Sequence, residues 1–228
     1  MNWALAYIEG SPLNNFTANE PAVSVGSMIC STILNAPFTW GFNRAENAGL
    51  ATVAGTQDYT VTLSDFGFLE KVSLGAGSQI FEVKDVYNTV ALGISSQQQR
   101  PNAVSVIANT AGTSIKLRFM GVPDAVYTAT LTYQKLAVQM TATSSTWSGI
   151  PDQYSDIYNN LFLAEAFAIS DDARAQIYRS RGVAALLAKS EGLTQMQINA
   201  FLAQWQARDA QALGAQLRTQ QGNQARGL

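Results

Sequence analysis

Few side chains in this sequence could carry out chemistry. It contains no histidine and a single cysteine, Cys30. Without histidine, neither a Ser-His-Asp nor a Cys-His arrangement can form, and the commonest metal ligand is missing. Cys30 lies among small and apolar residues, which predicts a buried core thiol. A single cysteine also excludes an internal disulfide and a Cys-based zinc cluster.

Pairs of carboxylates are the remaining candidates for a catalytic or metal site. Asp152 and Asp156 flank Tyr154 in the stretch "WSGIPDQYSDIYNNLFLAEAF", residues 147–167. Asp152 directly precedes an apolar helical pattern, so we interpret it as an N-cap. Asp156 falls in the first helical turn, where negative charge is favourable. The pair is therefore interpreted as a helix start.

The other acidic pairs have structural interpretations too. Asp171 and Asp172 stand at the start of a second helical pattern, where acids are favoured. Glu82 and Asp85 differ in strand parity and so face opposite sides of a strand. The glycines of "LGAGSQI" lack the lysine of a phosphate-binding loop and predict a tight turn. The sequence thus predicts no catalytic, cofactor-binding or metal site, and no enzyme.

Composition narrows the class further. Charged residues make up 13% of the chain, about half the usual ~25%, and a weakly charged surface indicates dependence on partners or assembly. With 14 basic and 16 acidic residues, the chain has no basic footprint for nucleic acid. It also shows neither an apolar run long enough for a membrane span nor the pattern of a signal peptide.

Residues 57–147 alternate in hydrophobicity, which predicts an antiparallel β domain. In "YTATLTYQK" the alternation places Tyr127, Ala129, Leu131 and Tyr133 inside, and Thr128, Thr130, Thr132 and Gln134 on a solvated face. Further strands are expected in "QDYTVTL", "SIKLRFM" and the segments near 68–73, 80–86 and 103–108. Six or seven short strands favour a small sandwich or a curled sheet.

Helical patterns flank this β domain. Residues 25–56 contain a leading helix, ended by Pro37, and an aromatic connector, "PFTWGFNR". We expect Phe38, Trp40 and Phe42 to fill the junction between that helix and the sheet. Residues 148–208 form a helical domain, and its first apolar stripe is Tyr154, Ile157, Tyr158 and Leu161.

Two more helices are expected in this domain. Ser170 or Asp171 caps one helix, which ends at Gly192. Thr194 and Gln197 have capping-box spacing and open the next, whose expected buried face is Ile198, Phe201, Leu202 and Trp205. Arg174, Arg179 and Arg181 form a solvated face, with contacts between subunits left open.

The ends of the chain have little periodicity. Residues 1–24 are interpreted as an N-terminal arm, and the Gln-rich tail 209–228 as disordered when alone. The whole is predicted to be α+β: one helix, an antiparallel β domain and a helical C-terminal part.

The order of these segments resembles a known family. The stretches that carry the resemblance are "ILNAPFTWGFNR", "GTQDYTV", "RPNAVSV", "VPDAVYTATLTYQK" and "IPDQYSDIYNNLFLAEAF". They are similar to head-to-tail connector proteins of tailed bacteriophages, of the adaptor or tail-tube gatekeeper type.

That resemblance implies a non-enzymatic virion protein, made in the host cytoplasm, at the head–tail junction. It implies a homo-oligomeric ring, commonly twelvefold, that binds the portal and tail proteins and lets DNA pass through its lumen. No cofactor and no membrane are implied. The implied portal contacts lie in the tail and are Arg218, Gln220, Gln221, Arg226 and Leu228.

Two alternatives stay open at this point. The chain could be a carbohydrate- or receptor-binding β-sandwich of a tail or surface protein, with Trp40, Trp147 or Tyr127 as stacking surfaces. The helical third of the chain argues against such a module. An enzyme with an acidic metal site is the third candidate.

Overall fold

The computed structural model describes residues 22–77, 79–85, 97–110, 113–137, 150–169 and 172–204. Trp147, Gly112, Ser170, Asp171, Trp205 and the predicted tail residues Arg218, Gln220, Gln221, Arg226 and Leu228 lie outside the described residues. So do almost all of the predicted N-terminal arm and the whole predicted tail.

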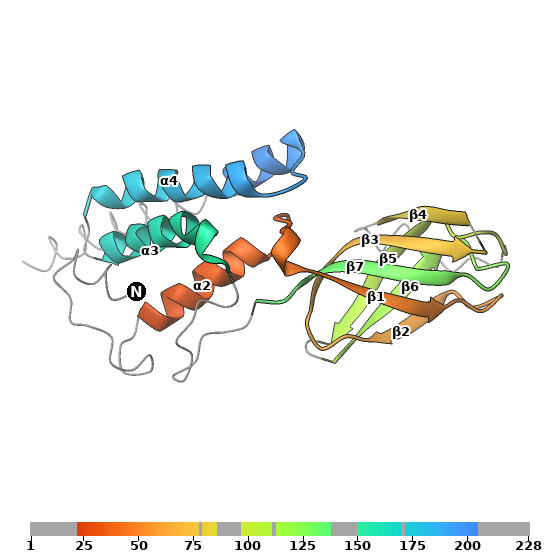
Figure 1. The fold of residues 1–228 in the computed structure, drawn as a ribbon. Coiled ribbons are helices and arrows are strands. Elements are labelled where there is room, and N and C mark those ends of the chain that lie inside the picture. The colour runs from red at the N-terminus through yellow and green to blue at the C-terminus, as the bar shows by residue number, and fades with distance from the viewer. Residues whose placement is uncertain are drawn as a thin grey trace, which may run out of the picture. The chain divides into compact units, whose positions relative to one another are not determined.

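The described elements follow the order that the sequence predicts: a helix, then the strands, then further helices (Figure 1). The helices are α2 (Ala22–Leu34), α3 (Ser155–Ile169) and α4 (Arg174–Lys189), with the short 3-10 turns η1 (Gly41–Asn43) and η3 (Asp152–Tyr154). The strands are β1 (Arg44–Ala51), β2 (Asp58–Thr62), β3 (Phe66–Ala76), β4 (Gln79–Asp85), β5 (Ala103–Thr110), β6 (Ser114–Met120) and β7 (Thr128–Lys135).

The seven strands are hydrogen-bonded in the order β1-β7-β3-β4-β5-β6-β2. All neighbours are antiparallel except β4 and β5, which meet in parallel at Lys84–Ala103 and Asp85–Val104. β4 therefore joins one antiparallel layer, β1-β7-β3-β4, to a second, β5-β6-β2 (Figure 1). The α+β prediction with an antiparallel sandwich is confirmed.

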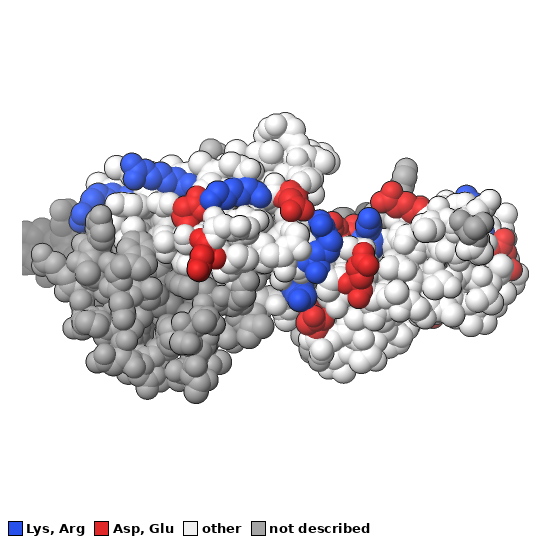
Figure 2. Space-filling model, in the orientation of Figure 1, with Lys and Arg blue, Asp and Glu red and all other residues white. Residues whose placement is uncertain are grey.

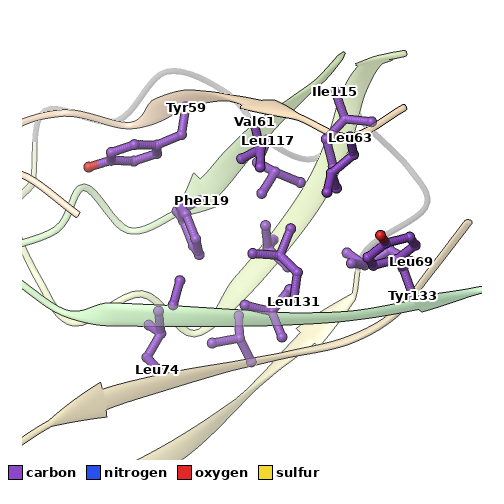
Figure 3. Packing of buried hydrophobic residues seen from close by; sticks show 14 of the residues in the cluster. Tyr59, Val61, Leu63, Leu69, Leu74, Ile115, Leu117, Phe119, Leu131 and Tyr133 are labelled. Carbon is purple, nitrogen blue, oxygen red and sulfur yellow. The ribbon is translucent and has the colours of Figure 1, made fainter. Parts of the chain in front are cut away.

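Side chains from both layers fill the space between them (Figure 3). The layer with β7 contributes Leu69, Leu74, Leu131 and Tyr133, and the other layer contributes Tyr59, Val61, Leu63, Ile115, Leu117 and Phe119. Burying each of the large side chains stabilises the fold by roughly 1.5–3 kcal/mol. The predicted inward residues of β7 are all buried.

The outward face of β7 corrects the sequence analysis. Thr132 and Gln134 were expected in solvent, but their exposed fractions are 3% and 0%. The register places Thr132 between Glu46 of β1 and Lys71 of β3, whose long side chains flank it. Gln134 is covered by the connector that precedes β1, through contacts described below.

Strand β1 was not predicted, because it lies at an edge of the sheet and carries little hydrophobicity. Its register with β7 shifts between Ala48 and Leu50, leaving Gly49 as a bulge at φ 103°. A bulge breaks the alternation that a strand search depends on, and its positive φ favours glycine.

Helices α3 and α4 pack closely against each other. Ile157, Tyr158 and Leu161 of the predicted α3 stripe are buried, and α4 buries Gly182, Val183 and Leu186. Gly182 marks the closest approach, because a Cβ built there would lie 2.7 Å from Cγ of Leu161 and 3.1 Å from its backbone nitrogen. Only glycine fits this position without displacing α3.

The helix starts are partly as predicted. Asp156 lies in the first turn of α3, as expected, but Asp152 is inside the 3-10 turn η3 and Pro151 occupies its N-cap without a side-chain bond. The N-cap role given to Asp152 is therefore wrong. Asp172 supplies an N-terminal bond to α4, because its carboxylate accepts the backbone N–H of Arg174 at 2.8 Å.

Residues 192–204 belong to a second unit, separate from the residues up to Glu191. Its helix covers residues 195–204. The predicted capping box is confirmed, since Gln197 accepts the Thr194 N–H at 2.9 Å and the Gln197 N–H donates to Oγ1 of Thr194 at 3.3 Å. Ile198, Phe201 and Leu202 are half-buried rather than buried.

Replacing Gly182 by alanine tests the packing of α3 against α4. Helix propensity alone predicts a gain of about 1 kcal/mol for Gly182→Ala, but overpacking costs about 1–3 kcal/mol, so we expect net destabilisation in urea unfolding. In a Leu161→Ala background the same change should become stabilising. Ser180→Ala, on the exposed side of α4, is the control, and equal effects at both positions would contradict the close approach.

Candidate functional site

The most connected polar cluster in the described structure lies where the sandwich meets the helices. We call it the junction, and it consists of Thr39, Trp40, Gly41, Arg44, Glu70, Gln134 and Glu191. These residues come from the connector after α2, from β1, β3 and β7, and from the segment that follows α4. The chain thus brings five separate segments to one place.

Trp40 anchors the junction in the helical half. Its side chain is 1% exposed, and its indole N–H donates to the carbonyl of Ile33, near the end of α2, at 2.7 Å. The ring makes an edge contact with Tyr154, and Phe42 lies against the same tyrosine. The prediction that these aromatics fill the junction between helix and sheet is confirmed for Trp40.

Gln134 ties the backbone of Trp40 to the sheet. Its side-chain oxygen accepts the Trp40 N–H at 3.2 Å, and its side-chain nitrogen donates to the Trp40 carbonyl at 3.3 Å. The same nitrogen donates to Oε2 of Glu70 at 2.9 Å. A fully buried amide with its partners satisfied stabilises, whereas an orphaned one is costly.

Arg44 holds two carboxylates together. Its guanidinium makes a bidentate pair with Glu70, with N–O distances down to 2.7 Å, and reaches Oε2 of Glu191 at 3.2 Å. Burial opposes ionisation of Glu70, but hydrogen bonds from Arg44 and Gln134 outweigh it and lower the pKa of Glu70. The bond to Glu70 likewise raises the pKa of Arg44. Glu70 and Arg44 therefore form a charged pair at neutral pH.

Glu191 fixes the end of the helical half to the connector. Its backbone N–H donates to the carbonyl of Thr39 at 3.1 Å, and the Thr39 hydroxyl donates back to the Glu191 carbonyl. Its side chain accepts the backbone N–H of Gly41 at 3.2 Å. These bonds close the junction between residues about 150 positions apart in the sequence.

The chemistry of the junction is structural. Its amide, guanidinium, carboxylate and hydroxyl groups are already hydrogen-bonded to one another or to the backbone. In the part of the chain that the structure describes, no group of three or more Asp, Glu or Cys side chains could hold a metal ion. The junction can hold the sandwich and the helices in one arrangement.

The residues singled out in the sequence do not come together as a site. Cys30 is fully buried, and burial raises the pKa of its thiol to about 12, which confirms the buried thiol. Asp156 pairs with Lys189 at 2.6 Å and Asp172 with Arg174 at 2.6 Å. Glu82 is exposed on β4.

Two of the three aromatic side chains that the carbohydrate-binding alternative named are buried, and the third, Trp147, lies outside the described residues. Trp40 is 1% exposed and Tyr127 is 8% exposed. The hydroxyl of Tyr127 donates to Asp124 at 2.7 Å. Neither ring can stack on a sugar without disrupting the core.

Sequence reasoning missed Glu70, Gln134 and Glu191. Glu70 and Gln134 fall at positions that read as the solvated side of a strand, and Glu191 follows a helix as an ordinary surface acid would. Arg44 was noted only as the end of the aromatic connector. No local pattern in the sequence marks Gln134 as buried, because alternation assigns its position to solvent.

A second charged cluster lies on the outer side of β2 and β6. Asp58 pairs with Arg118 at 2.7 Å and with Lys116 at 3.0 Å across the two strands. The hydrogen bond from Arg118 is the main cause that lowers the pKa of Asp58 to about 2, against an opposing effect of burial. The pair fixes the edge strand β2 to its neighbour.

The described cations are largely neutralised within the chain. Arg44, Lys116, Arg118, Arg174, Arg179 and Lys189 each pair with a carboxylate. Figure 2 shows several of the blue groups beside red ones on the face it presents. The surface therefore offers few free cations to phosphate.

Replacing Gln134 by alanine tests the junction. The buried N–H and carbonyl of Trp40 then lose their partners, each at about 1–3 kcal/mol, so we expect a loss of roughly 2–6 kcal/mol of unfolding free energy. Gln153→Ala, at an exposed position, is the control and should leave stability unchanged. Equal stability of the two variants would show that the junction contributes nothing.

The Asp58 cluster predicts a pH dependence of stability. The pKa of Asp58 is lowered in the folded state, so its contribution is present above the ordinary carboxylate pKa and is lost as pH falls through about 2. Asp58→Asn should therefore be destabilising at pH 7. The difference between variant and parent should shrink from about pH 4 downward in urea titrations, and a constant difference would contradict the ion pairs.

One known protein family matches almost all of the described residues. The SU10 adaptor protein family matches residues 29–224. No curated protein matches this sequence. No helix among the described residues is long and apolar enough to cross a membrane.

Proposed function

Since the chain belongs to the SU10 adaptor protein family, a family of phage head-to-tail adaptors, we propose that it assembles into a ring that connects the portal to the tail and lines the DNA passage. An adaptor of this family is a structural component of the virion. The ring, its twelvefold symmetry and its portal contacts are the parts that we propose.

The observation that carries this proposal is the junction. An adaptor bridges two neighbouring proteins, so we expect its two halves to keep a fixed arrangement. Hydrogen bonds tie the sandwich to the helices in two places. Gln134 of β7 bonds to Trp40, whose indole bonds to the end of α2. Arg44 of β1 bonds to Glu191, which follows α4. A binding module for a small ligand would not need this connection.

The charge distribution supports a DNA passage. Each phosphate that a protein neutralises adds affinity and salt dependence, so a channel through which DNA slides must expose few free cations. The chain has a net charge of −2, and its described ion pairs occupy most of its described basic side chains.

Electron microscopy of the protein mixed with the portal of the same phage tests the ring. We expect closed rings seated on the portal, with twelve subunits. Monomers that stay separate from the portal at micromolar concentration would contradict the proposal.

The tail carries the proposed portal contacts, Arg218, Gln220, Gln221, Arg226 and Leu228. Truncation of residues 209–228 should weaken portal binding at least about tenfold. Losing one hydrogen bond to a charged group costs about 1.5–3 kcal/mol, and about 1.4 kcal/mol corresponds to a factor of ten in affinity. Arg218→Ala with Arg226→Ala should reproduce part of the loss in a binding titration.

Arg174→Ala with Arg181→Ala is the matched control, since it removes the same charge from α4. Portal binding should be unchanged in this control. A truncated chain that binds the portal as the full chain does would remove the tail from the interface.

A further inference from the structure

Helix α4 exposes one large apolar side chain among small ones. Ile177 is 53% exposed. Its neighbours on the same helical face are Ala173, Ser180 and Ala184, and all three are exposed. Because these side chains are short, they leave room around Ile177 for another protein to approach the helix. We call this face, together with Arg181, the α4 surface.

Arg181 gives the α4 surface a positive charge. It follows Ile177 by four residues, so the rise of an α-helix separates the two by about 6 Å along the axis. Its guanidinium lies over the ring of Tyr178, 5.6 Å from the centroid, and Tyr178 stacks on the buried Phe167. The other two arginines of α4 pair with carboxylates, whereas Arg181 pairs with none among the described residues. Its charge is therefore held in place and available to a partner.

Strand β4 offers a complementary arrangement. Ile80 is 79% exposed, and its neighbour across the sheet is Gly75 of β3, which has no side chain to cover it. Glu82 follows two residues later on the same face of the strand and is exposed. Two residues of a strand span about 6.5–7 Å. Within the described part of the chain, Glu82 pairs with no basic side chain. We call Gly75, Ile80 and Glu82 the β4 surface.

The two surfaces match in spacing and in charge. Each presents an isoleucine with a charged side chain about 6–7 Å away, positive on α4 and negative on β4. When one surface lies against the other, Ile177 meets Ile80 in the space that Gly75 leaves open. Arg181 then faces Glu82. Two copies of the same surface would instead bring charges of one sign together, which is unfavourable.

From this match we propose that the α4 surface of one copy of the chain binds the β4 surface of the next copy. The inference rests on the proposed function and names a contact between the subunits of the ring. The occupant is a second copy because one chain carries both complementary surfaces. A contact between two different surfaces leaves one of each unused, so it continues from copy to copy and forms a ring when the rotation closes.

The charged pair is expected to select the partner more than to hold it. An exposed ion pair changes affinity by about fivefold or less, so alanine in place of Arg181 should leave the contact nearly intact. Reversal of a charge is the informative change, since like charges opposed across an interface are strongly unfavourable.

Ring assembly on the portal, measured against protein concentration, tests the pairing. Arg181→Glu alone and Glu82→Arg alone should each raise the concentration for half-maximal assembly about tenfold or more. The two changes together restore opposite charges, so the double variant should assemble within about threefold of the parent. Thr62→Glu, at an exposed position of β2, is the control and should assemble as the parent does.

Disulfide cross-linking tests the apolar centre of the same contact. Ile177→Cys chains mixed with Ile80→Cys chains should give linked dimers under mild oxidation, and a chain with both changes should give a ladder of higher oligomers. Either single variant without the other should give none, because the two surfaces differ. The native Cys30 is fully buried and does not interfere.

Each outcome decides. Single charge variants that assemble as the parent does overturn the pairing, and so does a double variant that is folded by circular dichroism but stays as weak as the singles. Variants that form rings but do not bind the portal would make the portal the occupant and also overturn it. If the parent forms no ring, the proposed function fails. Cross-linking of the mixed single variants then still decides the contact, since dimers support it and their absence overturns it.

Discussion

The rest of this structure depends on two hydrogen bonds between the buried side-chain amide of Gln134 and the backbone of Trp40. They join a strand of the sandwich to the connector that leaves α2. Because the amide is fully buried, losing it leaves the backbone N–H and carbonyl of Trp40 buried without partners. A polar contact thus holds the sandwich against the helices, while apolar packing stabilises each of the two halves separately.

Around this contact the charges are arranged to satisfy one another. Arg44 lies between Glu70 and Glu191, and Glu70 also accepts a bond from Gln134. The outer pair of Asp58 with Arg118 repeats the pattern on the other layer. Among the described residues, most basic side chains pair with carboxylates of the same chain, and a weakly charged surface suits assembly with other proteins.

The two ends of the sandwich differ in their surroundings. At the junction, polar bonds fix the β strands to the helices, and at the other end Val53 and Val126 are exposed. A rigid connection between the sandwich and the helices fits an adaptor, whose family the chain shares over residues 29–224.

The sequence by itself determined the elements whose signal is local. Alternation in β7, the helix stripe at Ile157 and Leu161, and the Thr194–Gln197 capping box each involve residues a few positions apart. Only the tertiary structure decided which polar residues are buried. Gln134 and Glu70 lie on the side of their strands that alternation assigns to solvent, and β1 at the edge is interrupted by a bulge at Gly49. The partners of Gln134 and Glu70 lie 26 to 94 residues away in the sequence, so no local pattern encodes the contacts.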